Sequence, residues 1–371
     1  MRTSYHHLAK NIVEYACTIQ PGENVMIDCT GVNDDFLEIL IAEIARKGGV
    51  PFVQINSARV QRALLSVTDD NRAKLLASFE LPIMQKMHAH IRIAGYDNVF
   101  ENNGVGADNL KSYATHFLKP VHYEERVKNT KWTLLRWPSP AFAQSAEMST
   151  LEFEELFFKV CTLNYQKMSD AMDPLVALME KTNNVKIVGN GTNLTFSIKG
   201  QKAVKCAGKN NIPDGEVFTA PIKNSVNGEI TFNIPSMERG TKFENVHFVV
   251  KNGKIISADA GANTKKLNEI LDTDEGARFF GEFALGVNPY ITKPILDTLF
   301  DEKIAGSFHL TPGACYEEAP NGDDSALHWD LVLCQTPECG GGEIWFDDVL
   351  IRKNGRFVLE ELLPLNPENL V

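Results

Sequence analysis

The segment NVMIDCTGVNDDFLEILIAEIARKGGVPFVQI, residues 24–55, sets the fold class of the first half of the chain. It opens with a short apolar run that predicts a buried strand. Asn33 and Asp34 can cap the helix that follows, and Gly48 and Gly49 stop it. A second apolar run, VPFVQI, predicts another strand. A strand, a helix and a strand at this spacing indicate a βαβ unit, in which the two strands are parallel.

The flanking sequence repeats this pattern. We expect helices over residues 7–19 and 70–86 and strands over residues 90–94 and 131–137. Residues 98–130 are polar, and we expect them to be irregular. Neither GxGxxG nor GxxxxGK[ST] follows any of these strands, so a nucleotide-binding function has no motif to support it. Residues 1–148 are therefore predicted to form an α/β domain with a parallel-type sheet.

A helical connector is expected over residues 149–182. It begins with a capping box, because the Ser149 hydroxyl and the Glu152 carboxylate can bind free backbone N–H groups at a helix start. The helix that follows carries apolar and aromatic side chains along one side, a pattern typical of core packing. Pro174 is expected to interrupt it, and a second helix should run to about residue 181.

The sequence pattern changes in residues 183–371. Short alternating runs such as TNLTFSIKG, GEITFNIP and HFVVKNGKIISA are separated by Gly or Asn-Gly turns. They predict a C-terminal α+β domain rich in antiparallel strands. One helix is expected over residues 264–280, leading directly into Gly281 and Glu282.

Composition narrows the class of protein. The 371 residues carry a net charge of −11, with 43% hydrophobic and 23% charged residues, which suits a globular enzyme with more than one core. The acidic balance argues against nucleic acid and anionic lipid as partners. Seven cysteines without a CxxC pair predict neither disulfides nor a thiolate zinc site. The start lacks a signal-peptide pattern and no run of about 18 apolar residues exists, so we expect a cytoplasmic protein.

The chemistry gathers in residues 281–330. Six residues of this segment are candidates to bind a metal or move protons: Glu282, Glu302, His309, Tyr316, His328 and Asp330. Taken singly, each has an ordinary explanation, such as a surface acid, a core histidine or a packing tyrosine. The sequence HWD is a more specific signal for metal binding, because side chains two apart in a strand point to the same face.

Glu216, in NIPDGEVFTAP, adds a further acid from an earlier strand-like segment. A set of carboxylates and imidazoles without thiolate suits Zn²⁺, Co²⁺ or Mn²⁺. More than three acidic ligands favour two ions that share a bridging carboxylate and activate a water.

Five motifs in this order, NIPDGEVFTAP, TDEGARFFGEFALG, LFDEK, HLTPGACY and ALHWD, resemble those of the thermophilic metallo-aminopeptidases of the aminopeptidase T and aminopeptidase S type. The resemblance extends over nearly the whole chain. It implies a hydrolase with two divalent ions per chain, held by Glu216, Glu282, Glu302, His309, His328 and Asp330. It further implies that Glu282 is the bridging ligand or general base and that Tyr316 stabilises the transition state or is an outer ligand. Homodimers with an internal cavity, which admits small peptides, are also implied.

The expected function is a metallo-aminopeptidase that releases N-terminal, hydrophobic residues. Two other functions, a dioxygenase and a binding or structural protein, stay open. The segment KIAGSF before His309 departs from the family pattern, which leaves Glu302 open as a ligand. The same fold family includes a ring-cleaving dioxygenase of dihydroxypyridine, and His309, His328 and Asp330 could form its Fe²⁺ triad. The second alternative is a binding or structural protein that has lost its metal.

Overall fold

The computed structural model describes residues 2–371, and the chain divides into two compact units. Unit 1 comprises Met1–Thr162 and Gly208–Ile212, and unit 2 comprises Leu163–Ala207 and Pro213–Val371. The helices expected to connect two domains are divided between the units, α8 (Thr150–Cys161) in the first and α9 (Tyr165–Lys181) in the second.

Helix α9 passes through Pro174, and the prediction that this proline interrupts the helix is wrong. Proline in a helix interior costs about 3 kcal/mol. Met168, Met172, Leu175 and Met179 lie on one buried face of the helix. Burying that face outweighs the cost of the proline, since each such side chain contributes roughly 1.5 to 3 kcal/mol.

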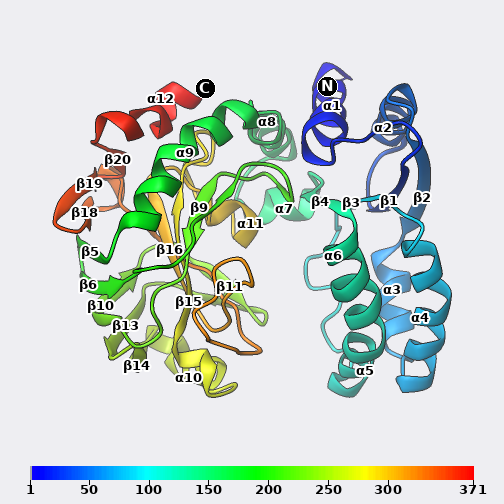
Figure 1. Ribbon diagram of the computed structural model, residues 1–371. Helices are drawn as coiled ribbons and strands as arrows, with labels where there is room; N and C mark the ends of the chain where they lie inside the picture. Colours follow the sequence, from blue (N-terminus) through cyan, green and yellow to red (C-terminus); the bar gives the residue numbers. More distant parts are fainter. Residues whose placement is uncertain (1) are drawn as a thin grey trace. The chain divides into compact units, whose positions relative to one another are not determined.

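Unit 1 contains a five-stranded sheet in the order β2-β1-β3-β4-β8, and all of its neighbouring strands are parallel. Its strands are β1 (Asn24–Thr30), β2 (Val50–Asn56), β3 (Ala89–Ala94), β4 (Lys131–Arg136) and β8 (Asn211–Ile212). The helices between β1 and β4 can be followed in Figure 1. The sheet confirms the parallel α/β architecture predicted from the βαβ pattern.

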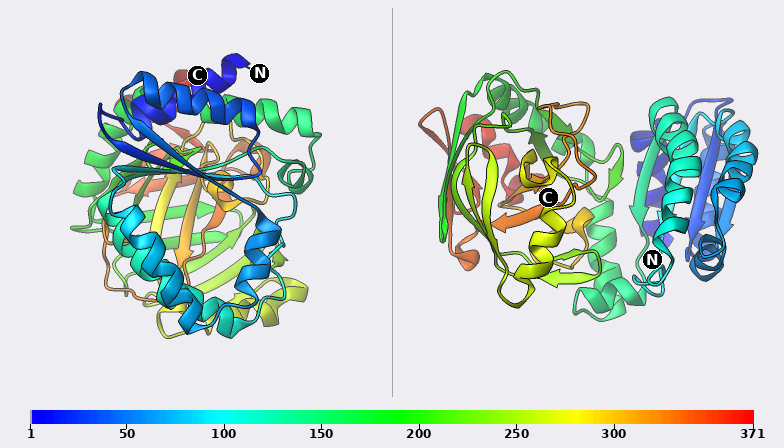
Figure 2. Two further views of the ribbon diagram at one scale, coloured as in Figure 1. Left: turned by 90° about the vertical axis from the view of Figure 1, so that its right-hand side faces the viewer. Right: turned by 90° about the horizontal axis from the view of Figure 1, so that it is seen from below.

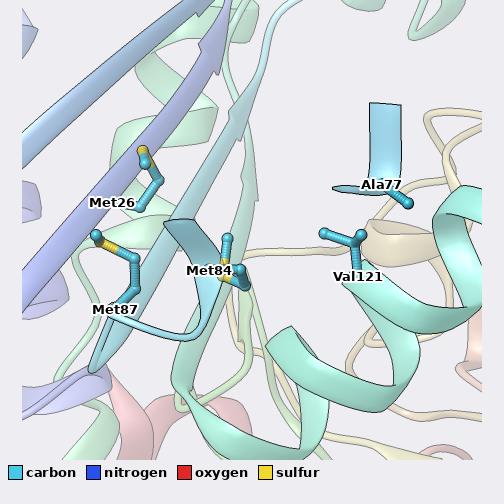
Figure 3. Close-up of a cluster of buried hydrophobic side chains, with 5 residues drawn as sticks. All are labelled: Met26, Ala77, Met84, Met87 and Val121. Atoms are coloured by element: carbon cyan, nitrogen blue, oxygen red, sulfur yellow. The ribbon is translucent and has the colours of Figure 1, made fainter. Parts of the chain in front are cut away.

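The helices of unit 1 alternate with these strands. They are α1 (Arg2–Lys10), the π-helical η1 (Asn11–Ala16), α2 (Asp34–Arg46), α3 (Ala58–Leu65), α4 (Asp70–Met84), α5 (Ala107–Tyr113), the π-helical η2 (Ala114–Arg126), α6 (Val127–Asn129), α7 (Pro140–Ser145) and α8. A cluster of Met26, Ala77, Met84, Met87 and Val121 joins β1 to α4 and η2 (Figure 3). These two helices therefore cover the sheet face that Met26 occupies.

The prediction that residues 98–130 are irregular holds for residues 98–106 and is wrong for the rest, because α5, η2 and α6 form continuous helix from Ala107 to Asn129. The reason is a narrow apolar face within a polar segment. Tyr113, Phe117 and Val121 recur at intervals of four, which places them on one side of a helix. Phe117 and Val121 pack against the methionine cluster, and this burial stabilises the helical conformation.

Unit 2 is built around two antiparallel sheets, as predicted. One has eight strands in the order β14-β13-β10-β6-β5-β18-β19-β20, and the other has five in the order β17-β16-β15-β9-β7. The strands of the larger sheet are β5 (Asn184–Gly189), β6 (Thr192–Ser197), β10 (Asn227–Phe232), β13 (Val246–Lys251), β14 (Lys254–Asp259), β18 (Gly342–Phe346), β19 (Val349–Lys353) and β20 (Arg356–Phe357).

The smaller sheet holds β7 (Val204–Cys206), β9 (Glu216–Thr219), β15 (Phe280–Gly286), β16 (Ser307–Pro312) and β17 (Leu331–Cys334). The remaining elements of the unit are the pair β11 (Ser236–Glu238) and β12 (Thr241–Phe243), α9, η3 (Gly261–Asn263), α10 (Thr264–Leu271), η4 (Gly276–Arg278), α11 (Thr298–Asp301), η5 (Pro337–Cys339), η6 (Glu360–Leu365) and α12 (Pro367–Leu370). None of the helices within residues 2–371 is both long and apolar enough to cross a bilayer.

The two sheets of unit 2 pack against each other through aromatic side chains, and their strands can be followed in two views in Figure 2. The ring centroids of Phe196 in β6 and Phe283 in β15 lie 5.0 Å apart, and those of Phe248 in β13 and Phe280 in β15 lie 6.4 Å apart. Every residue of β15 and β16 is buried. Polar side chains on these two strands are consequently held in the interior of unit 2.

The helix predicted over residues 264–280 forms only in its first half, and the prediction is wrong for the second half. Helix α10 ends at Leu271, and β15 already begins at Phe280. Between them the carboxylate of Asp274 accepts a hydrogen bond from the Ala277 amide at 3.0 Å. Such local bonds between a side chain and the backbone compete with helix formation. Glu282 therefore lies within a buried strand rather than at the end of a helix.

Candidate metal centre

Three neighbouring strands of the smaller sheet place three polar side chains on one face. In the ladder Glu216 of β9 pairs with Gly286 of β15, and His309 of β16 pairs with Ala284 of β15. Glu282 lies on the same face of β15 as Ala284 and Gly286, because side chains alternate along a strand. The two small residues leave room above β15, and the three functional side chains enclose that space.

The carboxylate of Glu282 lies between the two histidines of the sequence motif. Its Oε1 lies 3.3 Å from Nε2 of His309, and its Oε2 lies 3.4 Å from Nε2 of His328. On the other side of its ring, Nδ1 of His309 lies 3.7 Å from Oε2 of Glu216. The structure therefore brings together four residues predicted from separate motifs.

The HWD motif contributes both of its polar residues, as its spacing predicted. Nε2 of His328 lies 3.3 Å from Oδ1 of Asp330, just before β17 begins. Nδ1 of His328 donates a 2.8 Å hydrogen bond to the carbonyl oxygen of Ala314, which fixes the ring and leaves Nε2 for a ligand. The hydroxyl of Thr311 donates to Oδ1 of Asp330 at 2.6 Å and orients that carboxylate.

Lys303 is a central residue that sequence reasoning missed. Its side chain is 1% exposed, and its Nζ lies 2.5 Å from Oε1 of Glu216 and 2.6 Å from Oε1 of Glu302. Oδ1 of Asp214 lies 3.8 Å from the same atom. The run LFDEK reads as a surface segment, and its composition contains no signal that Glu302 and Lys303 are buried. Glu302 nevertheless reaches the centre, since it groups with His309 and Asp330.

Cys206 also borders the centre, although the sequence offered no thiolate motif. It pairs with Glu216 across β7 and β9 and forms a potential ligand group with Asp214 and Glu216. Burial raises the pKa of the Cys206 thiol well above its ordinary value, and the nearby carboxylates act in the same direction. The thiol is therefore protonated at neutral pH while no metal ion is bound.

The electrostatics of the centre favour bound cations. Burial by itself would lower the pKa of His309, but the carboxylates of Glu216 and Glu282 raise it to about 10. In the same way Asp330 and Glu282 outweigh burial and raise the pKa of His328 to about 12. The carboxylates that hold protons on these imidazoles can hold a metal ion in their place, since ligand atoms release protons when metal binds.

Tyr316 borders the centre beside His328. The two ring centroids lie 4.6 Å apart, and the ring of Phe218 lies 5.6 Å from that of Tyr316 on another side. The residue is 46% exposed, so it is not the core packing residue that its sequence context favoured. Burial of its phenol and the carboxylates of the centre raise its pKa, so the phenol is a hydrogen-bond donor at neutral pH.

The residues fit a metal by a direct structural criterion. Oε2 of Glu216, Nδ1 of His309 and Nε2 of His328 are buried and have no hydrogen-bond partner. Unpaired buried polar atoms are costly, and metal binding is one of the few ways to satisfy them. Potential ligand atoms of Glu216, Glu282 and His309 lie within 4.8 Å of one another, as do those of Glu282, His328 and Asp330. Glu282 is common to both groups.

Comparisons with known proteins agree with this geometry. Residues 2–357 match the family described as thermophilic metalloprotease (M29). The chain therefore belongs to this metalloprotease family, which confirms the family and the class of hydrolase expected from the motifs. The chain is similar to aminopeptidase AmpS of Bacillus subtilis (strain 168), with 26% identity over an alignment of 371 positions, gaps included, that covers 87% of each protein.

Two solved structures share the fold. Wild-type AmpT from Thermus thermophilus has a TM-score of 0.81 at 20% identity and covers 96% of this chain and 100% of its own. The 2,5-dihydroxypyridine dioxygenase of Pseudomonas putida KT2440 has a TM-score of 0.63 at 11% identity and covers 98% of this chain and 99% of its own. At these identities both likenesses establish the fold alone, and the family match distinguishes the two chemistries.

Proposed function

We propose that this chain is a metal-dependent aminopeptidase that releases N-terminal, hydrophobic amino acids from small peptides. The observation that carries the proposal is the position of Glu282, whose two carboxylate oxygens face His309 and His328 separately. A carboxylate placed in this way is suited to bridge two ions. The similarity to proteins named aminopeptidases supports the same reaction.

The charge balance supports two divalent ions. Asp214, Glu216, Glu282, Glu302 and Asp330 provide five carboxylates, and among residues 2–371 only Lys303 pairs a buried ammonium with them. When both imidazoles are neutral and all five carboxylates are ionised, the surplus of four negative charges equals the charge of two divalent cations. An imidazole and carboxylate set suits Zn²⁺, Co²⁺ or Mn²⁺. When bound, such ions act as Lewis acids and lower the pKa of a coordinated water.

The side chains around the ions have distinct roles. Glu282 faces both ligand groups and would serve there as the bridging ligand or as the general base that accepts the proton of the attacking water. The phenol of Tyr316 donates a hydrogen bond to the developing oxyanion of the scissile carbonyl. Glu302, whose Oε1 is held by Lys303, completes the acidic side of the centre.

We further propose a homodimer in the cytoplasm. All seven cysteines are free, as is typical of a reducing compartment. The outer strand β2 exposes Phe52 by 42% and Ile55 by 70%, and α4 exposes Phe79 by 62%. Exposed apolar side chains of this size favour contact with a second copy.

The test is metal analysis combined with activity. The purified protein, loaded in turn with Zn²⁺, Co²⁺ or Mn²⁺, should hold two ions per chain and hydrolyse chromogenic leucyl, phenylalanyl and methionyl amides. Glu282→Gln should abolish turnover and reduce metal content while the far-ultraviolet circular dichroism stays native. Glu275→Gln, at an exposed glutamate, should behave like the native protein.

One outcome contradicts the proposal outright. A single iron per chain, with oxygen uptake on 2,5-dihydroxypyridine and no amide hydrolysis, would identify a dioxygenase instead. The absence of metal after careful loading, without any effect of a chelator, would identify a binding protein.

A further inference from the structure

Unit 1 contains a cavity that the metal centre does not use. Its volume is about 710 Å³, within the range typical of small-molecule sites. It lies over the sheet face that carries Asp28, His90 and Arg92, and helices α3, α4 and η2 supply its remaining walls. All residues that line it belong to unit 1.

The wall of the cavity contains a buried arginine without an acidic partner. Arg126 is 8% exposed, and its two terminal nitrogens lie 3.2 Å from Nδ1 of His90 and 3.0 Å from Nε2 of His122. Its Nε is buried and has no hydrogen-bond partner. No carboxylate among residues 2–371 forms an ion pair with its guanidinium. Asp28 stabilises the Arg126 charge only at longer range, so the buried guanidinium lacks a directly bonded counter-ion and the position favours an anion.

The neighbouring groups do not supply that anion. Burial and the charge of Arg126 hold the pKa of His90 well below its ordinary value, so His90 is neutral. Oδ1 of Asp28 already accepts hydrogen bonds from Arg92 at 2.6 Å and from Asn56 at 2.7 Å. Arg72 also lines the cavity, and its buried Nε has no hydrogen-bond partner either. Two arginines of this cavity are therefore left without acidic partners.

One part of the cavity wall is apolar. Leu76 and Met84 of α4, Phe117 and Val121 of η2, and Leu134 of β4 line the cavity. Met84 and Val121 also belong to the methionine cluster shown in Figure 3, which anchors the two helices to β1. The site therefore offers an apolar wall together with a buried cationic group.

We propose that the cavity of unit 1 binds a small organic anion, whose carboxylate or phosphate group pairs with Arg126 and whose apolar body packs between α4 and η2. Arginine binds both kinds of group through two parallel hydrogen bonds, so the shared chemistry is a planar or tetrahedral oxyanion on an apolar scaffold. Glu80 also lines the cavity, burial raises its carboxyl pKa, and it forms no ion pair with either arginine in the part of the chain that the structure describes.

Trp132 offers a local reporter of binding. Its ring lies under the Arg126 guanidinium, 5.6 Å from centroid to Cζ, whereas Trp329 lies between the ligand residues His328 and Asp330. Full-length protein labelled with 5-fluorotryptophan should give separate ¹⁹F resonances for its four tryptophans, and Trp132→Phe assigns the relevant one. Anions that bind at the metal centre would move the Trp329 resonance instead.

The probes are phenylacetate, phenyl phosphate and the neutral phenylacetamide. We expect phenylacetate, phenyl phosphate or both to move the Trp132 resonance to saturation, and phenylacetamide to have no such effect. Saturation by only one of the two anions assigns the ligand to the carboxylate or to the phosphate class. Failure of both anions to saturate at about 10 mM, or an equal response to phenylacetamide, overturns the proposal.

Arg126→Met separates binding from folding. It should weaken anion binding roughly tenfold to a hundredfold. The melting temperature without ligand should stay unchanged or rise, because the variant removes an unpaired buried charge. Arg59→Met makes the same change at an exposed position of α3 and should bind as the native protein does. Native binding by Arg126→Met, or a clear fall in its melting temperature without ligand, would identify Arg126 as a structural residue.

Discussion

Nζ of Lys303 lies 2.6 Å from Oε1 of Glu302, the residue just before it in the chain, and both side chains are buried. The same ammonium holds Oε1 of Glu216. Oε2 of Glu216 is left without a hydrogen-bond partner, 3.7 Å from Nδ1 of His309. Lys303 thus occupies one oxygen of each glutamate and directs the free oxygen of Glu216 to the metal centre. The carboxylates in turn hold the pKa of the Lys303 ammonium well above its usual range, although burial acts in the opposite direction.

Lys303→Met should destabilise the metal-free protein and weaken metal binding. Removing the cation leaves two buried carboxylates unpaired, an effect of about 3 to 5 kcal/mol in comparable buried pairs. Urea denaturation after chelation measures the change in the free energy of unfolding, and calorimetric titration measures metal affinity. Lys265→Met removes a lysine whose side chain is 92% exposed and should change stability by no more than about 0.5 kcal/mol. Equal stability of the two variants would contradict the central role of Lys303.

Tyr316→Phe should lower kcat by about a hundredfold and leave KM nearly unchanged. The phenol is proposed to act on the oxyanion of the transition state, so its loss should spare ground-state binding. The residue is half-exposed, and its removal should leave the melting temperature unchanged. Steady-state kinetics on a leucyl amide substrate give both constants. Tyr123→Phe, at an exposed tyrosine of unit 1, should retain native kcat, and a native kcat for Tyr316→Phe would exclude the proposed role.

Periodicity predicted the elements whose burial pattern is simple. The βαβ unit of residues 24–55 and the alternating strands of unit 2 each have one apolar pattern and clear turn residues, and both are confirmed. The helix from Ala107 to Asn129 was missed, because only Tyr113, Phe117 and Val121 mark its buried face among polar residues. Such a narrow face becomes visible only when its partner, the methionine cluster, is known.

Some residues of the candidate site could be predicted from the sequence, and others could not. Glu282, His309, His328 and Asp330 stand in motifs whose residue types predict metal binding, and the structure places them within 4.0 Å of a neighbour in the set. Lys303 could not be predicted, since its burial depends on the ladder between β9 and β15 that brings Glu216 to it. The local composition around Lys303 cannot reveal its contact with Glu216, which lies 87 positions away in the chain.

Gly281→Ala should displace Glu282 and abolish activity. A Cβ atom at Gly281 would lie 2.2 Å from the carbonyl oxygen of Ala314 and 2.5 Å from that of Gly313, and both are backbone atoms that cannot move freely. The ladder between β15 and β16 is already irregular between Phe280 and Glu282. We expect destabilisation of about 1 to 3 kcal/mol by urea denaturation, together with loss of amide hydrolysis.

Gly189→Ala is the matched control, since the nearest atom to its added Cβ would lie 3.5 Å away, an ordinary contact. This variant should keep native activity and lose no more than about 1 kcal/mol. Native activity and stability of Gly281→Ala would show that the strands can separate at this point, in contradiction to the packing described above.

Asp274 ties the segment before His328 to η4. Its Oδ2 accepts a hydrogen bond from the Ala326 amide at 2.7 Å, and its Oδ1 accepts from the hydroxyl of Ser325 at 2.7 Å and from the Ala277 amide at 3.0 Å. These donors, the Ala326 amide foremost, hold the pKa of the Asp274 carboxyl below its usual range. The ionised carboxylate therefore stabilises the folded state.

Asp274→Asn should cost roughly 1 kcal/mol at neutral pH, because the amide places an NH₂ group against one of the backbone donors. A carboxyl whose pKa is lowered by folding contributes its full stabilisation above the unfolded value of about 3.9. That contribution is lost as the pH falls through the lower folded value, so the difference between native protein and variant should shrink progressively as the pH falls below about 3.9. Urea denaturation of metal-free protein across this pH range measures the difference. Asp324→Asn, at an exposed neighbour, should show no such trend, and a difference for Asp274→Asn that persists in acid would show that its ionisation is not the cause.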